Sequence, residues 1–412
     1  MNTIALRRLA AWLAALILVA SLPGAAPDPA ATARRDLLDL LERKGLITAE
    51  EAAGLATPAP SAVIGPGNKA ITKLTLGGRI QAQFAALSGE DDSAADPSAR
   101  NHFLLRRVYL SAKAELGPDW RLNLTYNFAN SLFDVAAIQW ARPDLTVDAG
   151  YRMVNFGREQ RTSSGALKAI ERSAVTRYFV ESNNGTRLGA GSYRVGVFAD
   201  GKTDHAFWGA AVTNPEQPVS SADAAGTGSG VTNQPALWLD GGLRLAPRGA
   251  ALRVGAAAGW LPDQGGRTPG SGDDLLVGSA HAELVAGPLS VLAEVFVSHH
   301  PGGAADGSDT RALGAYLQPA WRFGPRLEGV ARIGYLDTDG RGVRMADAIP
   351  GSPTLPATDR LWDAYLGGTW YLRGDDLKFQ AGLVCARGED TPAGTATTSG
   401  TFGVRSQVQM NF

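Results

Sequence analysis

The sequence of 412 residues contains one cysteine, Cys385, and carries a formal net charge of −1. A single cysteine cannot form a disulfide bond within the chain, so no disulfide framework holds this fold together. The near-zero net charge argues against nucleic acid as a partner. After residue 22 no apolar run approaches the roughly 20 residues that a membrane-spanning helix needs. The sequence therefore points away from disulfide-rich domains, nucleic-acid-binding proteins and bundles of membrane helices.

Catalytic motifs are also missing. The chain has no G-x-S-x-G, H-E-x-x-H or phosphate-binding P-loop pattern, and its five histidines are scattered. We therefore expect a protein that is not an enzyme and that has no catalytic residues, no metal site and no cofactor.

The first 33 residues have the organisation of a secretory signal peptide. Arg7 and Arg8 form a positive start, residues 9–22 form an apolar core, and small residues follow. The triplet Ala31-Thr32-Ala33 offers a cleavage site, and we place the cleavage between residues 26 and 33. An uncleaved anchor is the alternative, but its apolar run is short for a spanning helix. The sequence thus predicts export from the cytoplasm.

A short helical segment is expected over residues 34–56, with an apolar stripe of leucines: Leu37, Leu38, Leu40 and Leu41. Thr48, with Glu51 three residues later, forms a capping box for a second helical turn. Residues 57–72 are rich in proline and glycine and are interpreted as a linker. We interpret the helical segment as a small periplasmic appendage. A plug or a self-association element is the alternative.

From residue 73 to residue 412 apolar and polar residues alternate, which is the pattern of strands with one apolar face. Residues 120–128 and 252–260 are clear examples. The alternating runs extend over about 10 to 15 residues, longer than most strands of soluble proteins and long enough to cross a membrane. Aromatic residues such as Trp120, Trp260 and Trp370 stand near the ends of these runs, as they do in interfacial girdles.

Short and long connections alternate along the chain. The long ones are expected at residues 86–102, 156–185, 214–235, 262–273, 300–310, 339–358 and 389–398. This spacing gives about 16 antiparallel strands with both ends on the short-turn side, as in outer-membrane barrels. Because lipid offers no hydrogen bonds to an open sheet edge, the sheet must close. The sequence therefore predicts an all-β fold, a transmembrane antiparallel β-barrel over residues 73–412.

The last run of alternating residues ends in Phe412. A terminal aromatic residue on such a strand resembles the signal that the outer-membrane assembly machinery recognises. We therefore expect this machinery to be a partner and the bacterial outer membrane to be the location.

Several stretches together resemble the phosphate-selective porin O and P family of outer-membrane channels. They are the helical opening at residues 37–52, LLRRVYL at 104–110, WRLNLTYNFA at 120–129, GREQ at 157–160, TSS at 162–164, IERS at 170–173, TWYL at 369–372 and LKFQAG at 377–382. The resemblance implies a 16-stranded barrel, usually trimeric, that passes anions or small polar solutes. Phosphate-selective members carry a lysine cluster. This chain has few lysines, and such a cluster is not evident in it.

The polar side of the strands is expected to line the lumen, with the basic candidates Arg79, Arg107, Arg121, Arg152, Arg253 and Arg332. The long segment of residues 157–184 is the candidate constriction, since charges on a loop inside a barrel are little screened. Its candidates are Arg158, Arg161, Lys168, Arg172, Arg177 and Glu171. An ordinary extracellular loop is the alternative for this segment, and charges that merely solvate a wet interior are the alternative for each residue.

We therefore expect an outer-membrane porin, a water-filled channel for passive diffusion of small hydrophilic solutes, with a modest preference for anions and with phosphate as a candidate solute. Its expected partners are outer-membrane lipid, lipopolysaccharide and small anions or polar solutes, in a homotrimer that the resemblance implies. A general or cation-tolerant porin is one alternative. The other is a non-conducting structural or adhesive barrel with a plugged lumen.

Overall fold

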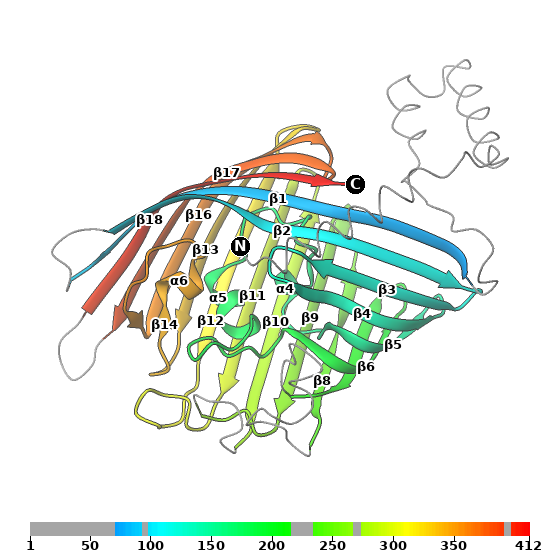
Figure 1. The fold of residues 1–412 in the computed structure, drawn as a ribbon, viewed down its shortest axis with the longest axis horizontal. Helices are drawn as coiled ribbons and strands as arrows, with labels where there is room; N and C mark the ends of the chain where they lie inside the picture. The colour runs from blue at the N-terminus through cyan, green and yellow to red at the C-terminus, as the bar shows by residue number, and fades with distance from the viewer. Residues whose placement is uncertain (1–70, 93–97, 216–233, 267–272, 391–396) are drawn as a thin grey trace. The chain divides into compact units, whose positions relative to one another are not determined.

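The computed structural model describes residues 71–92, 98–215, 234–266, 273–390 and 397–412. Sixteen antiparallel strands close into one barrel in which β1 pairs with β18 as well as with β2 (Figure 1). Every other strand of the barrel lies beside its neighbours in the chain, apart from the pairing of β13 with β16 across an inserted two-stranded sheet. The predicted fold class and strand number are confirmed.

The barrel strands are β1 (Ile71–Asp91), β2 (Ser98–Leu116), β3 (Trp120–Asn127), β4 (Leu132–Ala141), β5 (Leu145–Met153), β6 (Tyr193–Lys202), β7 (Ala206–Thr213), β8 (Ala236–Leu245), β9 (Ala251–Leu261), β10 (Leu275–Ala286), β11 (Leu289–His299), β12 (Leu313–Arg322), β13 (Leu327–Asp337), β16 (Arg360–Arg373), β17 (Leu377–Asp390) and β18 (Thr397–Asn411). The other described elements are α4 (Arg158–Arg161), α5 (Ala174–Val180), the 3-10 turn η2 (Pro247–Gly249), β14 (Val343–Arg344), α6 (Met345–Ala348) and β15 (Ala357–Thr358).

Two of the expected long connections differ from the structure. The first was expected over residues 86–102, but β1 continues to Asp91 and β2 begins at Ser98, so that the two strands pair through residues of low apolar content. The second, over residues 339–358, is not a plain exposed loop: it contains β14, α6 and β15 and buries Val343, Met345 and Ala348. Residues 86–91 alternate only weakly between apolar and polar side chains, so the sequence did not indicate that they pair. The structure of the second connection depends on contacts with a loop that is distant in the sequence.

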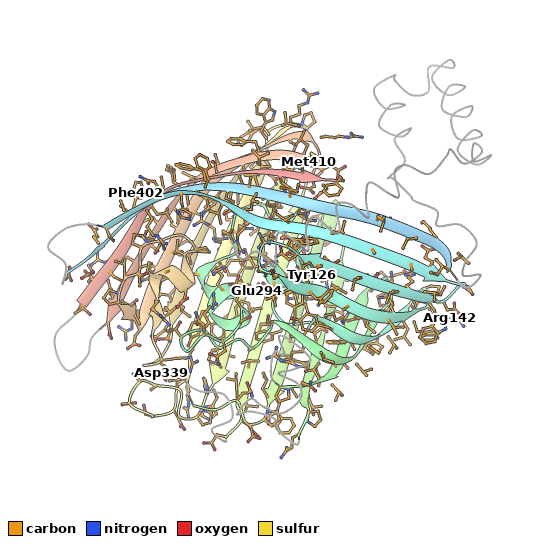
Figure 2. The ribbon with its side chains drawn as sticks, viewed as in Figure 1. Tyr126, Arg142, Glu294, Asp339, Phe402 and Met410 are labelled. Atoms are coloured by element: carbon orange, nitrogen blue, oxygen red, sulfur yellow. The ribbon has the colours of Figure 1, made fainter. Side chains whose placement is uncertain are left out.

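The outer surface of the barrel is apolar. Phe103 is 84% exposed, Leu239 66% and Leu366 61%, and each projects from a strand whose neighbouring side chains point inward. Aromatic residues gather at the strand ends on the short-turn side: Trp120, Trp208, Trp321, Phe323 and Trp370. Figure 2 labels two of these exposed apolar side chains, Met410 and Phe402 of β18. Such an apolar band with aromatic girdles suits a bilayer.

Among the described residues no helix is both long and apolar enough to cross a membrane. The barrel begins at Ile71, two residues before the expected boundary. The predicted signal peptide, helical segment and most of the linker lie outside the described residues and stay predictions.

Candidate functional site

The connection between β5 and β6, residues 154–192, folds into the barrel and is called the constriction loop below. Its short helices α4 and α5 lie inside the ring of strands (Figure 1). Val175, Phe179 and Phe156 have no exposed surface and pack against Phe296 of β11 and Trp238 of β8. Burial of these apolar side chains is the main force that keeps the loop inside. One side of the lumen is therefore filled.

A buried carboxylate holds the start of α4. Glu294 of β11 accepts hydrogen bonds from the backbone N–H groups of Arg158 and Glu159, and Tyr316 donates its hydroxyl to Glu294 at 2.7 Å. Gly157, immediately before the helix, has φ +81°, a conformation that favours glycine. Backbone donors at the first turn of a helix have no partner within the helix, so a wall carboxylate satisfies them.

Two further buried ion-pair groups fix the middle of the loop. Arg332 of β13 lies 3.3 Å from Glu159 Oε1 and 3.6 Å from Asp363 Oδ2. Arg106 of β2 binds Glu171 through two nitrogens, at 2.7 Å and 3.1 Å. Burial alone would raise the pKa of Glu171, but Arg106 beside it holds that pKa well below its usual range. Glu171 is therefore ionised, and the loop is attached on both sides.

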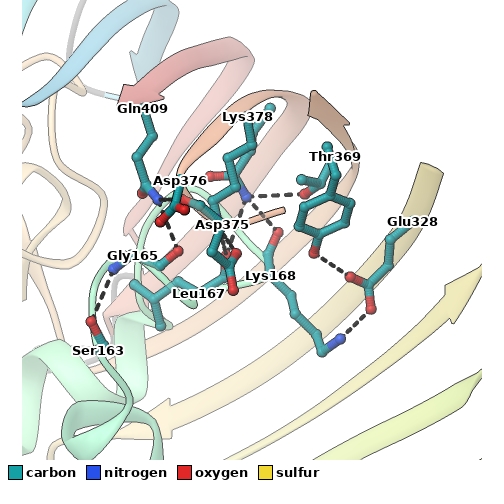
Figure 3. Close-up of polar contacts among 12 residues, drawn as sticks. Ser163, Gly165, Leu167, Lys168, Glu328, Thr369, Asp375, Asp376, Lys378 and Gln409 are labelled. Atoms are coloured by element: carbon teal, nitrogen blue, oxygen red, sulfur yellow. Dashed lines mark hydrogen bonds and ion pairs between the residues drawn. The ribbon is translucent and has the colours of Figure 1, made fainter. Parts of the chain in front are cut away.

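The tip of the loop is attached through its backbone (Figure 3). The carbonyl of Gly165 accepts from Gln409 at 3.1 Å, and that of Leu167 accepts from Lys378 and Gln380. Lys168 pairs with Glu328 of β13. Because β13, β17 and β18 supply these groups, the tip crosses the lumen rather than pointing to the outside.

An opening of about 850 Å³ remains between the constriction loop and the inner wall of β1 to β6. Eight basic and only two acidic residues line it. The basic ones are Arg79, Arg106, Arg107, Lys113, Arg161, Arg172, Arg187 and Arg194; the acidic ones are Asp134 and Glu181. The positive excess that the whole chain lacks is concentrated here.

Arg79, Arg107 and Arg172 each donate hydrogen bonds to neutral groups. Arg79 donates to Asn411, Ser163 and Ser164 side chains, and Arg107 donates to Gln81 Oε1 at 2.8 Å. Arg172 donates to the carbonyl oxygens of Gln160 and Thr162. Within the described ranges no carboxylate lies within 4.0 Å of any of the three, so no contacting acid neutralises their charge. Their field extends into the opening.

Most of the remaining sequence candidates are engaged with other groups, and of those named next only Arg161 lines the opening. In the constriction loop Arg161 pairs with Asp240, Arg158 with Glu283, and the buried Arg177 with Glu181. On the wall, Arg152 bridges Asp148 and Asp200, Arg253 lies 4.0 Å from the centre of the Phe207 ring, and Arg121 is exposed on β3 near the short turns. Arg158, Arg177, Arg152, Arg253 and Arg121 do not line the opening described above.

Arg106 and Asp134 line the opening but were not among the sequence candidates. A strict two-residue period places Arg106 on the lipid side of β2. Gln81 of β1 pairs with Arg107 and Ala82 pairs with Leu105, so Arg106 is the extra residue of a β-bulge. In this position its side chain reaches Glu171. An arginine facing lipid is costly, so two adjacent arginines in one membrane strand were a usable signal of this bulge.

The connection between β13 and β16, residues 338–359, supports the constriction loop from the side of the long loops. The Asp347 carboxylate accepts from Asn184 Nδ2 at 2.7 Å and from Thr186 Oγ1 at 2.8 Å, and its carbonyl accepts from Arg177. The segment around residues 181–188, which lines the opening, is thus fixed by a second loop.

We expect Asp347→Ala to increase brief closures and current noise of the open channel, because two donors of the constriction loop lose their acceptor. The measurement is single-channel recording in planar bilayers. Thr354→Ala removes an exposed side chain of the same loop and should record like the wild type. Equal noise in both variants would show that Asp347 does not fix the opening.

His300 joins three loops. Its Nδ1 lies 3.4 Å from Arg341 Nη1, and Arg341, 1% exposed, donates to the carbonyl oxygens of Thr186 and Gly303. Burial and the neighbouring Arg341 lower the pKa of His300 from 6.5 to about 4. A buried histidine of this kind must acquire charge beside an arginine when it is protonated.

This arrangement predicts that acid loosens the loops. An exposed imidazole binds a proton more readily than the buried one. The free energy that favours the packed loops therefore decreases as the pH falls below about 6.5, and this contribution of His300 is lost below about pH 4. We expect current fluctuations to rise between pH 7 and pH 4 and His300→Gln to reduce that rise. An identical pH dependence in the variant would assign the effect to other groups.

Residues 74–412 match the family described as phosphate-selective porin O and P. The fold is similar to that of an anion-selective porin from Comamonas acidovorans, with a TM-score of 0.56, 13% identity and coverage of 81% of this chain and 99% of that chain. It is also similar to the outer-membrane channel DcaP of Acinetobacter baumannii, with a TM-score of 0.54, 12% identity and coverage of 85% and 100%.

A third similar structure is OmpF of Salmonella typhi in complex with daunomycin, with a TM-score of 0.53, 12% identity and coverage of 85% of this chain and 100% of that chain. No curated protein sequence matches the chain. At these identities the structural matches establish the shared barrel fold, while the sequence match over residues 74–412 establishes the family. The chain belongs to the phosphate-selective porin O and P family and is an outer-membrane porin.

Proposed function

We propose that this porin is a passive diffusion channel that favours small anions. The observation that carries the proposal is the excess of basic residues around the opening, eight against two. Arg79, Arg107 and Arg172 contribute most, because their hydrogen-bond acceptors are neutral. A positive field in a narrow, partly desolvated opening lowers the free energy of an anion there and raises that of a cation. A similar barrel is an anion-selective porin, which agrees with this sign.

The sequence candidates divide into two roles under this proposal. Arg79, Arg107 and Arg172 set the selectivity, and Arg161 lines the opening with its charge paired to Asp240. Arg158, Lys168, Arg332 and Glu171 hold the constriction loop in place, since their charges are engaged in ion pairs with the wall or the loop. Arg121, Arg152, Arg177 and Arg253 add to the field of the interior away from the opening. Guanidinium groups suit oxyanions, so phosphate is among the solutes admitted.

A structural or adhesive barrel with a plugged lumen remains the second candidate, and one observation favours it: the constriction loop packs an apolar core against the wall. The opening of about 850 Å³ beside that core favours conduction. We further propose that the protein is not an enzyme, that it assembles as a homotrimer, and that its other partners are outer-membrane lipid, lipopolysaccharide and the assembly machinery that reads Phe412.

The test is single-channel conductance in planar bilayers under a potassium chloride gradient, followed by addition of phosphate. Stepwise currents whose reversal potential approaches that of chloride support an anion channel. Stepwise currents without selectivity contradict the anion preference. Folded barrels that give no current contradict the channel and support the structural alternative.

A further inference from the structure

We propose that the opening favours anions that carry a flat apolar ring, that is, small aromatic carboxylates, over hydrophilic anions of equal charge. This inference rests on the proposed anion channel and names the class of solute for the same opening. It follows from what faces the arginines, because the wall of β4, β5 and β6 contributes mainly aromatic and apolar side chains.

Three tyrosines line the opening: Tyr109 of β2, Tyr151 of β5 and Tyr193 of β6. The rings of Tyr151 and Tyr193 are stacked, with centroids 5.7 Å apart and planes 23° apart. The side chains around them are Leu132, Val135 and Met153, which also line the opening. A pore that passes only hydrophilic ions does not need such a cluster, because apolar side chains make no favourable contact with a hydrated ion.

The acid on this wall is held by a tyrosine. Tyr193 donates its hydroxyl to Asp134 Oδ2 at 3.2 Å. The hydroxyl end of Tyr193 is therefore engaged with the carboxylate. Opposite signs of charge on facing walls would suit any small ion. Here the side of β4 to β6 carries the stacked tyrosines, apolar side chains, one tyrosine-bound carboxylate and Arg194, and Arg79 lies 5.8 Å from the centre of the Tyr109 ring on β2. Guanidinium groups and aromatic rings therefore lie together in one opening.

An aromatic carboxylate matches both kinds of group. Its carboxylate can accept paired hydrogen bonds from a guanidinium fork, of which Arg79 of β1, beside the loop tip, and Arg172 within the loop are examples. Its ring packs against tyrosine rings, and such aromatic pairs add stabilisation beyond the area they bury. Phosphate or chloride would gain the first contact and none of the second.

The experiment compares two solutes that differ only in ring flatness and aromaticity, namely benzoate and cyclohexanecarboxylate. Each is added to the full-length channel in potassium chloride, and the concentration that halves the chloride current is measured. We expect benzoate to block at a concentration about threefold lower than cyclohexanecarboxylate, the size of one aromatic contact. Phosphate should block less than benzoate.

The triple variant Tyr109→Leu/Tyr151→Leu/Tyr193→Leu should make the two carboxylates equal, while Tyr193→Phe, which keeps the ring, should preserve the preference. Tyr126→Leu is the matched control, because Tyr126 packs on Phe128 and Phe133 but does not itself line the opening, and it should leave the preference unchanged (Figure 2).

The outcomes separate the two proposals. An anion-selective wild-type channel that benzoate and cyclohexanecarboxylate block equally overturns this inference and leaves the anion channel standing. A channel without anion selectivity overturns the proposed function itself. A preference for benzoate that survives in the triple leucine variant also overturns the inference, because the ring would then bind elsewhere.

Discussion

Replacing Arg79, Arg107 and Arg172 together with glutamine is expected to reduce the ratio of chloride to potassium permeability by about tenfold. These guanidinium groups donate hydrogen bonds to neutral acceptors, so their removal subtracts positive charge that no carboxylate in contact with them balances. Glutamine keeps a polar side chain that can still donate to Ser163 or to a carbonyl oxygen. The reversal potential under a salt gradient measures the change.

The control for this variant removes the same charge away from the opening. Arg142, Arg360 and Arg387 have side chains 56%, 59% and 65% exposed and do not line the opening. Their triple glutamine variant should keep the wild-type reversal potential. If both triple variants shift it equally, selectivity arises from net charge and not from the opening, and the proposed site is wrong.

Arg332→Met is expected to release the constriction loop. The substitution leaves Glu159 and Asp363, both 2% exposed, buried without their arginine, and breaking a buried ion pair in this way costs about 3–5 kcal/mol. The carbonyl of Glu171 also loses a donor at 2.9 Å. A displaced loop widens the lumen, so single-channel conductance should rise and added trypsin should cleave within residues 158–172.

Arg332→Lys is the comparison that separates charge from side-chain shape. Lysine restores a positive charge beside Glu159 but cannot reach both acids and the carbonyl at once, since it lacks the planar fork. We expect intermediate conductance and slower cleavage. Wild-type conductance and trypsin resistance in Arg332→Met would mean that the apolar core alone holds the loop.

The barrel could be predicted because its physical requirement is local. A bilayer demands one apolar side chain in every two, and Trp120 to Phe128 satisfies this demand without reference to the rest of the chain. The weak alternation of residues 86–91 did not meet that criterion, although these residues pair with β18 and β2. Register across the sheet, rather than composition, makes them a strand.

The opening could be predicted only in part. The length and charge of residues 157–184 indicated an inward loop, and the structure places that loop inside the barrel. Sequence could not tell which arginine would meet an acid, because Arg161 and Arg172 lie on the same loop and only the first reaches one, Asp240. Arg106 was missed because one inserted residue reverses the side to which a strand residue points.

The packing of the constriction loop against β8 to β13 has a consequence for any solute. A permeating ion travels off the barrel axis, along β1 to β6, and stays near the same row of guanidinium groups while it passes. The packed constriction loop separates the buried charged groups on the filled side, such as Glu294 and Arg332, from a permeating ion. The field that acts on a permeating ion therefore depends on the charges that line the opening, and not on the sum of charges around the whole barrel. The inner wall of β8 to β13 supports the constriction loop, and the inner wall of β1 to β6 lines the opening through which a solute would pass.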